Sequence, residues 1–219
     1  MDFSVQDSWH TNAQEWIKLI DGQKIGSRTF TNKAIMELLQ NQPGKRVLDM
    51  GCGEGWLTRS LTKMGKTAIG VDATETLLAN ARTKGSETFL NLSYEDIGKG
   101  KAIIGAPFDL AVFNFSIYQK DGLDVLLRNV KRTLNGKGRI IIQTLHPMLL
   151  LNLGLAYESQ LMHDSWAGLP GNFVNGHSWY ARTFEGWSHT IAAAGMQIIR
   201  LHEVNDTSQK PVSLILEIG

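Results

Sequence analysis

The chain has 219 residues, of which 22 are Lys or Arg and 21 are Asp or Glu, so its formal net charge is +1. This length fits a single open-sheet domain that is large enough to bury a core without disulfides. The balanced charge argues against a nucleic-acid partner, and the single cysteine, Cys52, excludes a disulfide framework and fits a reducing cytoplasm.

Residues 1–40 are predicted to form two helices that act as an N-terminal cap. Their apolar stripe consists of Trp9, Ala13, Trp16, Ile17 and Ile20. The amino terminus lacks the basic region and apolar run of a signal peptide, so we expect a cytoplasmic protein. Arg28 precedes the second helix. Its planar guanidinium suits a carboxylate of a cofactor or substrate, although an exposed helix cap fits equally well.

Residues 44–147 alternate short apolar runs with helical periods. Strands are predicted at Arg46–Met50, Ala68–Asp72, Thr88–Leu92, Phe108–Phe113 and Arg139–Thr144. Helices are predicted at Trp56–Met64, Thr74–Thr83, Ile97–Ile103 and Leu123–Leu134. Strands separated by helix-length segments indicate parallel crossovers. We therefore expect an α/β fold: a Rossmann-like open twisted sheet, mostly parallel, with helices on both faces.

A glycine loop follows the first strand, in the order Asp49-Met50-Gly51-Cys52-Gly53-Glu54-Gly55. Glycines at this spacing let the chain turn tightly and let a ligand lie against bare amides. The carboxylates of Asp49 and Glu54 would repel a diphosphate but attract a cation. The loop therefore suits an adenosine ligand with a positive distal end, such as S-adenosylmethionine. Asp49, Gly51, Cys52 and Gly53 are the expected cofactor contacts, with Cys52 as a small filling residue or, alternatively, a reactive thiol.

Further polar residues stand where the next strands end. A carboxylate at Asp72, followed by Ala73, can accept both hydroxyls of an adenosine ribose, or it can cap the helix that starts near Thr74. Ser93 and Tyr94 can read an adenine edge through a side-chain acceptor and a backbone amide. Because ligands of such sheets bind beyond the carboxyl ends of the strands, these positions converge with Asn114 and Phe115 on one site.

His146 closes the fifth strand of the core. A neutral imidazole at a pocket mouth can take a proton from an acceptor hydroxyl, and a hydrogen-bonded structural histidine is the alternative. The other histidines show no metal-ligand spacing, so we expect no metal site.

Residues 148–182 are predicted to be irregular and to form a lid or substrate loop. Trp179 and Tyr180 are expected to wall an apolar substrate pocket together with Trp9 and Trp16, although each also fits plain packing. The apolar run at its start contains Asn152 and is too short to cross a bilayer, so we expect no membrane partner.

Residues 183–219 are predicted to form a final helix, Thr183–Ala194, and an antiparallel edge hairpin of Met196–Val204 and Pro211–Ile218. Upstream of them, five basic residues gather at Arg128, Lys131, Arg132, Lys137 and Arg139. They fit a nucleic-acid patch or the solvated face of a helix. The lack of interleaved aromatic residues favours the solvated face.

These motifs together resemble those of class I S-adenosylmethionine-dependent methyltransferases, particularly the bacterial small-molecule, quinone-biosynthesis-like group. The motifs of the resemblance are Leu48 to Gly55, Gly70-Val71-Asp72, Phe108 to Phe115, Leu134 to Gly138 and Trp179 to Met196. The resemblance implies a seven-stranded sheet with an antiparallel last strand. It also implies S-adenosylmethionine as cofactor and S-adenosylhomocysteine as product.

The expected function is therefore methyl transfer to a small-molecule acceptor by in-line displacement, by either a monomer or a homodimer. Many members of this family carry an acid at the position of Ser93, which shifts adenine reading partly to backbone atoms. Two alternatives remain: a non-catalytic S-adenosylmethionine-binding protein, and a nicotinamide-dependent oxidoreductase. The oxidoreductase would favour a Gly-x-Gly-x-x-Gly loop without acids beside it.

Overall fold

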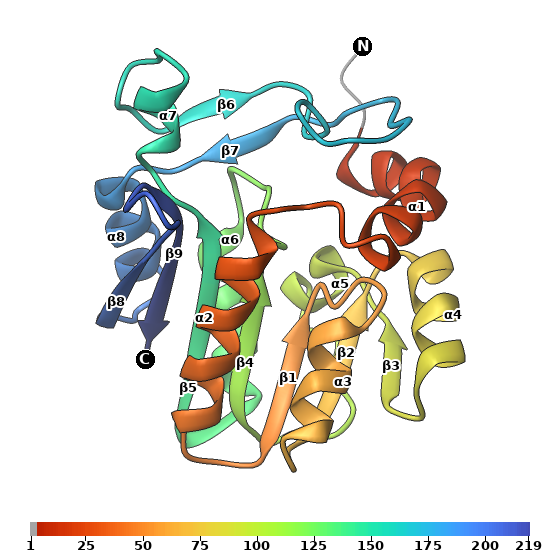
Figure 1. The fold of residues 1–219 in the computed structure, drawn as a ribbon. Coiled ribbons are helices and arrows are strands. Elements are labelled where there is room, and N and C mark those ends of the chain that lie inside the picture. The colour runs from red at the N-terminus through yellow and green to blue at the C-terminus, as the bar shows by residue number, and fades with distance from the viewer. Residues whose placement is uncertain (1–3) are drawn as a thin grey trace.

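A seven-stranded sheet forms the centre of the computed structural model, which describes residues 4–219 (Figure 1). Its strands are β1 (Arg46–Met50), β2 (Thr67–Asp72), β3 (Thr88–Asn91), β4 (Phe108–Asn114), β5 (Leu134–Leu145), β8 (Ile198–Asn205) and β9 (Pro211–Ile218). They lie in the order β3-β2-β1-β4-β5-β9-β8. β1 to β5 pair in parallel, and β9 runs antiparallel to both β5 and β8. The predicted parallel sheet with an antiparallel edge hairpin is confirmed.

Helices cover both faces of this sheet. They are α1 (Val5–Asp21), α2 (Arg28–Asn41), α3 (Trp56–Lys63), α4 (Glu75–Lys84), α5 (Tyr94–Gly98), α6 (Leu123–Arg132), α7 (Leu149–Asn152) and α8 (Phe184–Ala193). Val47 of β1 packs in the core under α2 and α3, whereas Leu48 and Met50 pack under α6 and α8. Because Val47 to Met50 of β1 are buried, this part of the strand is apolar except for Asp49.

The helix predicted over Ile97–Ile103 is wrong, because α5 starts and ends earlier. The side chain of Ser93 caps α5 by accepting a hydrogen bond from the backbone N–H of Asp96 at 3.0 Å. Gly98 and Gly100 then end the helix, and Gly100 has a positive φ of 89°. A serine followed three residues later by an acid is a helix-start signal, and here it outweighs the apolar spacing of Ile97 and Ile103.

The lid segment is more regular than predicted. In addition to the short α7, it contains β6 (Gln160–Met162) and β7 (Trp179–Ala181), which form a two-stranded antiparallel sheet. Figure 1 shows β6 and β7 beyond the carboxyl ends of the parallel strands, at the same end of the sheet as α1. The predicted amino-terminal helices are present as α1 and α2, and residues 1–3 of that segment lie outside the described residues.

None of the helices in residues 4–219 combines the length and the apolar character that crossing a membrane requires.

Candidate functional site

The glycine loop after β1 is fixed to the neighbouring strand β2. The backbone N–H groups of Gly51 and Cys52 both donate to the carbonyl of Val71, at 2.7 and 3.0 Å. Cys52 is buried, and its side chain packs with Leu78, Ala81 and Phe89. Burial raises the pKa of its thiol well above the usual value, so the side chain remains a neutral filling group.

The loop turns through glycines with positive φ, at 70° for Gly51, 55° for Gly53 and 78° for Gly55. The first is required by close packing, since a Cβ on Gly51 would lie 2.4 Å from the Cβ of Ser116. The second borders open space, because within residues 4–219 no atom outside the adjacent residues lies within 4 Å of the place where a Cβ of Gly53 would stand. The loop therefore presents bare backbone to a free volume at Gly53.

Asp72 at the end of β2 is bonded directly to this loop. Its Oδ2 accepts a hydrogen bond from the N–H of Gly53 at 2.9 Å, and its Oδ1 accepts one from the N–H of Thr74 at 2.8 Å. Each carboxylate oxygen can accept a second bond, so both oxygens can still receive a ligand hydroxyl. The adjacent Ala73 accepts through its carbonyl from the side chain of Asn91 at 3.1 Å.

Three carboxylates share this corner of the molecule. Asp49 is 1% exposed and accepts a bond from Oγ1 of Thr58 at 2.6 Å. Burial raises the pKa of Asp49 to about 7; the charges of Glu54 and Asp72 add to the rise, and the bond from Thr58 opposes it. Burial also raises the pKa values of Glu54 and Asp72. Burial thus disfavours the charged forms of all three acids, and a cationic ligand at this corner would favour them.

Arg28 and Glu54 bring opposite charges to the edge of the same loop. The guanidinium of Arg28 lies over the ring of Trp56, 5.0 Å from its centroid. Burial lowers the pKa of Arg28, whereas the charge of Glu54 raises it. Oε1 of Glu54 is buried and has no hydrogen-bond partner among residues 4–219. The two charges influence each other, yet this oxygen is left without a bond.

Two side chains from outside the loop, one at the start of α5 and one just after β4, support it through hydrogen bonds. The hydroxyl of Tyr94 donates to Oγ of Ser116 at 2.9 Å, and Ser116 donates to the carbonyl of Met50 at 2.7 Å. Burial raises the pKa of Tyr94 well above its usual value, so the phenol stays protonated. The side chain of Ser93 is occupied as the cap of α5. Sequence reasoning missed Ser116, because only the tertiary structure places it under Gly51.

Asn114 and Phe115 lie at the end of β4, beside the glycine loop. β4 pairs with β1 so that Phe113 stands opposite Met50. Oδ1 of Asn114 is buried without a hydrogen-bond partner among the described residues. Phe115 has a left-handed backbone with φ 52°, and its N–H donates to the carbonyl of Gln143 at 2.8 Å. A bulky residue held in this conformation marks a constrained turn of the kind that gathers at functional sites.

His146 does not face this site with a free nitrogen. Its Nε2 bonds with Oε1 of Glu203 at 2.9 Å, and its Nδ1 accepts from the N–H of Met148 at 3.2 Å. The ring is 2% exposed and packs edge-on against Phe184. Because both nitrogens are engaged where the chain leaves β5 for the lid, the structural alternative is favoured over a base at the pocket mouth.

Aromatic residues from α1 and the lid form a cluster over the carboxyl end of the sheet. The ring centroid of Trp9 lies 5.1 Å from Trp16, 4.8 Å from Trp166 and 6.1 Å from Tyr118. Two of the predicted wall residues, Trp9 and Trp16, therefore lie together, and their rings pack against each other. Tyr118 and Trp166 were not among the predicted wall residues.

Trp179 and Tyr180 belong to a different part of the lid. Both lie in β7, where Trp179 pairs with Met162 and Tyr180 pairs with Leu161. The ring of Tyr180 stands between two cations, with Nζ of Lys120 at 5.7 Å and the guanidinium of Arg182 at 5.0 Å from its centroid. The structure records no ring contact between them and the cluster around Trp9 within residues 4–219.

The lid is bonded to α1 through three polar side chains. Nε1 of Trp166 donates to Oγ of Ser8 at 2.9 Å, between two buried side chains. Asn12 donates to the carbonyl of Val174 at 2.7 Å and accepts from its N–H at 2.9 Å. The N–H of Asn172 donates to Oε1 of Glu15 at 3.1 Å. We call these contacts the α1–lid latch; in this structure they hold the lid down over the site.

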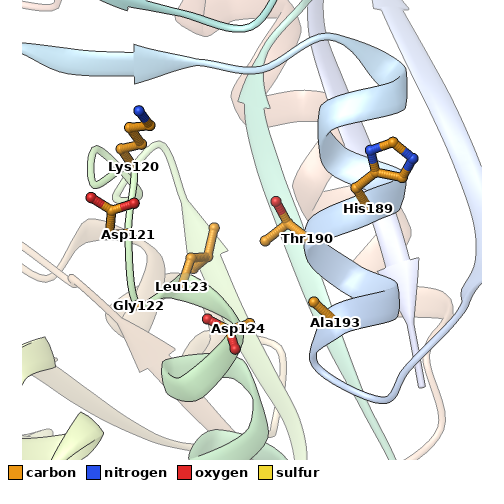
Figure 2. A pocket seen from close by; sticks show the side chains of 8 residues that line it. All are labelled: Lys120, Asp121, Gly122, Leu123, Asp124, His189, Thr190 and Ala193. Atoms are coloured by element: carbon orange, nitrogen blue, oxygen red, sulfur yellow. The ribbon is translucent and has the colours of Figure 1, made fainter.

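A separate surface pocket of about 310 Å³ lies between the loop before α6 and α8 (Figure 2). Its lining includes Lys120, Asp124, His189 and Thr190, and none of the predicted site residues. The basic residues noted near α6 are used locally: Arg128 pairs with Asp124, for example. The glycine loop and the strand ends beside it therefore remain the candidate site.

The sequence matches a family model described as "Methyltransferase domain" over residues 25–200. Malonyl-[acyl-carrier protein] O-methyltransferase from Legionella pneumophila is 29% identical over 159 residues, covering 71% of this chain and 54% of the relative. Ubiquinone biosynthesis O-methyltransferase from Coxiella burnetii is 42% identical over 86 residues, covering 38% of this chain and 36% of the relative. The chain thus aligns with about half or less of the length of these curated relatives.

Solved structures match nearly the whole chain. One is Burkholderia thailandensis 1,6-didemethyltoxoflavin-N1-methyltransferase with bound 1,6-didemethyltoxoflavin and S-adenosylhomocysteine, at a TM-score of 0.65 and 16% identity. The match covers 100% of this chain and 91% of that one. Magnesium protoporphyrin IX methyltransferase from Synechocystis, with bound SAH, matches at a TM-score of 0.64 and 19% identity, over 98% and 96% of the two chains. At these identities the likeness concerns the fold.

Proposed function

Because the chain belongs to the family of class I S-adenosylmethionine-dependent methyltransferases, we propose that it transfers a methyl group from S-adenosylmethionine (SAM) to a small-molecule acceptor. The product of the cofactor is then S-adenosylhomocysteine (SAH). The observation that carries the proposal is the glycine loop after β1, with open space at Gly53 and three carboxylates around it. The named acceptors of the relatives differ widely, which supports a small molecule as the acceptor class but no single compound.

The three acids around the glycine loop suit SAM better than a dinucleotide. Asp49, Glu54 and Asp72 all have raised pKa values, mainly because burial leaves their negative charges poorly solvated. A pyrophosphate would add negative charge to this corner, whereas the sulfonium and ammonium of SAM would offset it. This electrostatic fit also argues against a nicotinamide-dependent oxidoreductase.

The adenosine part of the cofactor is assigned to the ends of β2 and β3. Asp72 would accept the ribose hydroxyls, since each of its oxygens has capacity for one more hydrogen bond. The hydroxyl of Ser93 is occupied in capping α5, so adenine recognition would fall to backbone atoms of Ser93 and Tyr94. Ala73 adjoins the ribose position.

The methionine part is assigned to the edge of the loop. Arg28 would hold the carboxylate of SAM, because its fork geometry matches that group and its cation stands beside the loop. Glu54 would attract the ammonium, since its buried Oε1 has no partner among residues 4–219. Gly51, Cys52 and Gly53 would pass beneath the ligand, and Asn114 and Phe115 would face it from β4.

When bound, SAM supplies an electrophilic methyl group on a sulfonium sulfur. The rigid loop, fixed to β2 and supported by Ser116, would hold that end in a single orientation. The latched lid would keep water away from the acceptor. Burial raises the pKa values of Tyr94 and Tyr118, so these phenols stay protonated and can donate hydrogen bonds but not act as bases.

A panel of ligands in thermal unfolding tests this assignment. A ligand at 100 times its dissociation constant stabilises a fold by about 2.7 kcal/mol. We expect SAH to raise the melting temperature while NAD and NADP leave it unchanged. Stabilisation by NAD and not by SAH would overturn the assignment. A mass-spectrometric screen for products 14 Da heavier than their precursors, an increment of about one methylene as expected for methyl transfer, then separates an enzyme from a silent SAM-binding protein.

A further inference from the structure

The loop between β4 and α6, residues 115–121, connects the lid with the glycine loop. On one side, Ser116 donates to the carbonyl of Met50 at 2.7 Å and fills the space beside Gly51. On the other side, the carbonyl of Tyr118 accepts from the N–H of Tyr180 in β7 at 2.8 Å. Movement of this loop would therefore change contacts with both the glycine loop and β7.

Arg182, which follows β7, attaches this loop to the lid through two further hydrogen bonds. Its Nη2 donates to the carbonyls of Gln119 and Lys120, at 2.9 and 2.8 Å. Its Nε donates to Oγ1 of Thr190 on α8 at 3.3 Å, so the side chain joins the loop to α8. Lys120 and Thr190 line opposite walls of the surface pocket in Figure 2, and Arg182 bridges those walls.

The environment of Arg182 keeps the guanidinium in one position. The side chain is 5% exposed, and the group lies between the rings of Tyr180 and Trp187, at 5.0 and 5.2 Å from their centroids. Burial lowers the pKa of Arg182 to about 10, so it remains a cation at neutral pH. The two cation–π contacts and the bonds from Nη2 to the two carbonyls together restrain the guanidinium.

The same loop carries Phe115, which is next to Ser116 at the glycine loop, and Tyr118, which contacts Trp9 of the aromatic cluster. We place the acceptor beside these two residues and call that volume the acceptor space. Phe115 has its left-handed backbone at the start of the loop, and the hydroxyl of Tyr118 donates to the carbonyl of Phe115 at 2.8 Å. The ring of Tyr118 packs against Trp9 of the aromatic cluster. The position of Phe115 and Tyr118 thus depends on how the loop is held.

We propose that Arg182 is a positioning residue for methyl transfer: by holding the carbonyls of Gln119 and Lys120, it fixes Phe115 and Tyr118 as one wall of the acceptor space. This inference rests on the proposed function, since it gives the wall a role in the reaction. Arg182 acts through Gln119 and Lys120, at the end of the loop away from Ser116 and the glycine loop, so we expect it to affect the transfer rate more than cofactor binding.

Two variants and one matched control test the inference. Arg182→Lys keeps the cation between the rings but loses the planar fork, and Arg182→Ala removes both. Arg46→Lys is the control, because Arg46 also donates to two loop carbonyls, those of Pro107 and Gly105, but at the amino end of β1. Amide hydrogen exchange in the ligand-free proteins reports the loop directly. Both Arg182 variants should exchange faster over residues 115–121, and the control should not.

Transfer of tritiated methyl from SAM to an intracellular small-molecule extract reports the reaction. We expect Arg182→Lys to lower the maximal rate about 10- to 100-fold, as a misplaced reacting geometry does, with the KM for SAM within about threefold of wild type. Guanidinium ion should restore part of the rate in Arg182→Ala and none in Arg46→Lys.

Unchanged exchange over residues 115–121 in both Arg182 variants would overturn the inference, as would an unchanged transfer rate. An equal loss of rate in Arg46→Lys would overturn the inference, because it would assign the effect of Arg182 to general stability. A loss of SAH affinity together with rate in the Arg182 variants would overturn it as well. Failure of the wild type to bind SAH would instead refute the proposed function. Failure to transfer label despite SAH binding would refute the catalytic role of the wall.

Discussion

At the scale of single residues, Asp49 is the group whose environment departs most from that of a surface carboxylate. It is buried in the middle strand of the parallel sheet, next to two further acids. Burial raises its pKa from 3.8 to about 7, so the folded protein holds a proton there that the unfolded chain has released. Its stabilising contribution is therefore fully present below pH 4 and is lost as pH rises through about 7.

The variant Asp49→Asn tests the predicted decrease of stability with rising pH. Asparagine keeps an oxygen that can accept the bond from Thr58, but it does not titrate. Between pH 5 and pH 8, the free energy of unfolding should fall less steeply with pH in Asp49→Asn than in the wild type. The same variant should bind SAM more weakly relative to SAH, because the sulfonium loses an anionic neighbour. Urea titrations across this pH range, in roughly 1 M steps on either side of the midpoint, measure the first effect. Parallel pH profiles in the two proteins would contradict it.

Gly53 offers a second test at this scale. Gly53 and Gly65 both have positive φ, at 55° and 83°, and an added Cβ would meet no atom within 4 Å at either site. Replacing either by Ala should therefore cost a similar 1–2 kcal/mol, roughly the strain of a left-handed alanine. Only Gly53→Ala places a methyl group in the proposed cofactor space, so its affinity for SAH should fall at least tenfold, about 1.4 kcal/mol. Isothermal titration with SAH checks this, and equal affinities in the two variants would move the cofactor elsewhere.

Sequence alone locates the residues whose role depends on local chain geometry. The order strand, acid, glycine loop predicts where Asp49 and Gly53 lie, and the end of β2 predicts Asp72, because strand and turn signals are short-range. His146 shows the opposite case. Its neighbours Glu203 and Phe184 come from elements far along the chain, so its two occupied nitrogens could not be anticipated.

At the scale of elements, the strands and most helices follow from apolar periodicity, whereas caps decide the exceptions. Because Ser93 caps α5, this helix starts three residues before the predicted segment Ile97–Ile103. The lid was predicted as irregular because β6 and β7 have three residues each, too few to show an alternating pattern. Its attachment to α1 joins residues more than 150 positions apart, such as Asn12 and Val174, and no local signal encodes that pairing.

Asn12 is the residue through which the α1–lid latch is best tested. It is 2% exposed and makes two hydrogen bonds with the backbone of Val174. Asn12→Ala removes both, which should lower the free energy of unfolding by about 2 kcal/mol at roughly 1 kcal/mol per bond. Amide exchange over residues 163–177 should rise, while exchange in β1 and β4 should not. Thr11→Ala on the same helix, at an exposed position, is the control. Equal exchange over the lid in both variants would show that Asn12 does not hold it.

At the scale of the whole molecule, the sheet positions the glycine loop, and the lid lies beyond the carboxyl ends of the parallel strands (Figure 1). The family resemblance implies seven strands with an antiparallel last strand, and the sheet has this arrangement. The contacts of the lid with α1 and with the loop at residues 115–121 rest on side chains from both ends of the sequence, so no local signal predicts them.

The latch also has a kinetic consequence. Trp166, Asn12 and Glu15 tie the lid to a helix that itself packs against α4, so the lid can lift only when these contacts break. Exchange of the spent cofactor beneath the lid would then require that opening, and the rate of exchange would depend on how often the latch breaks.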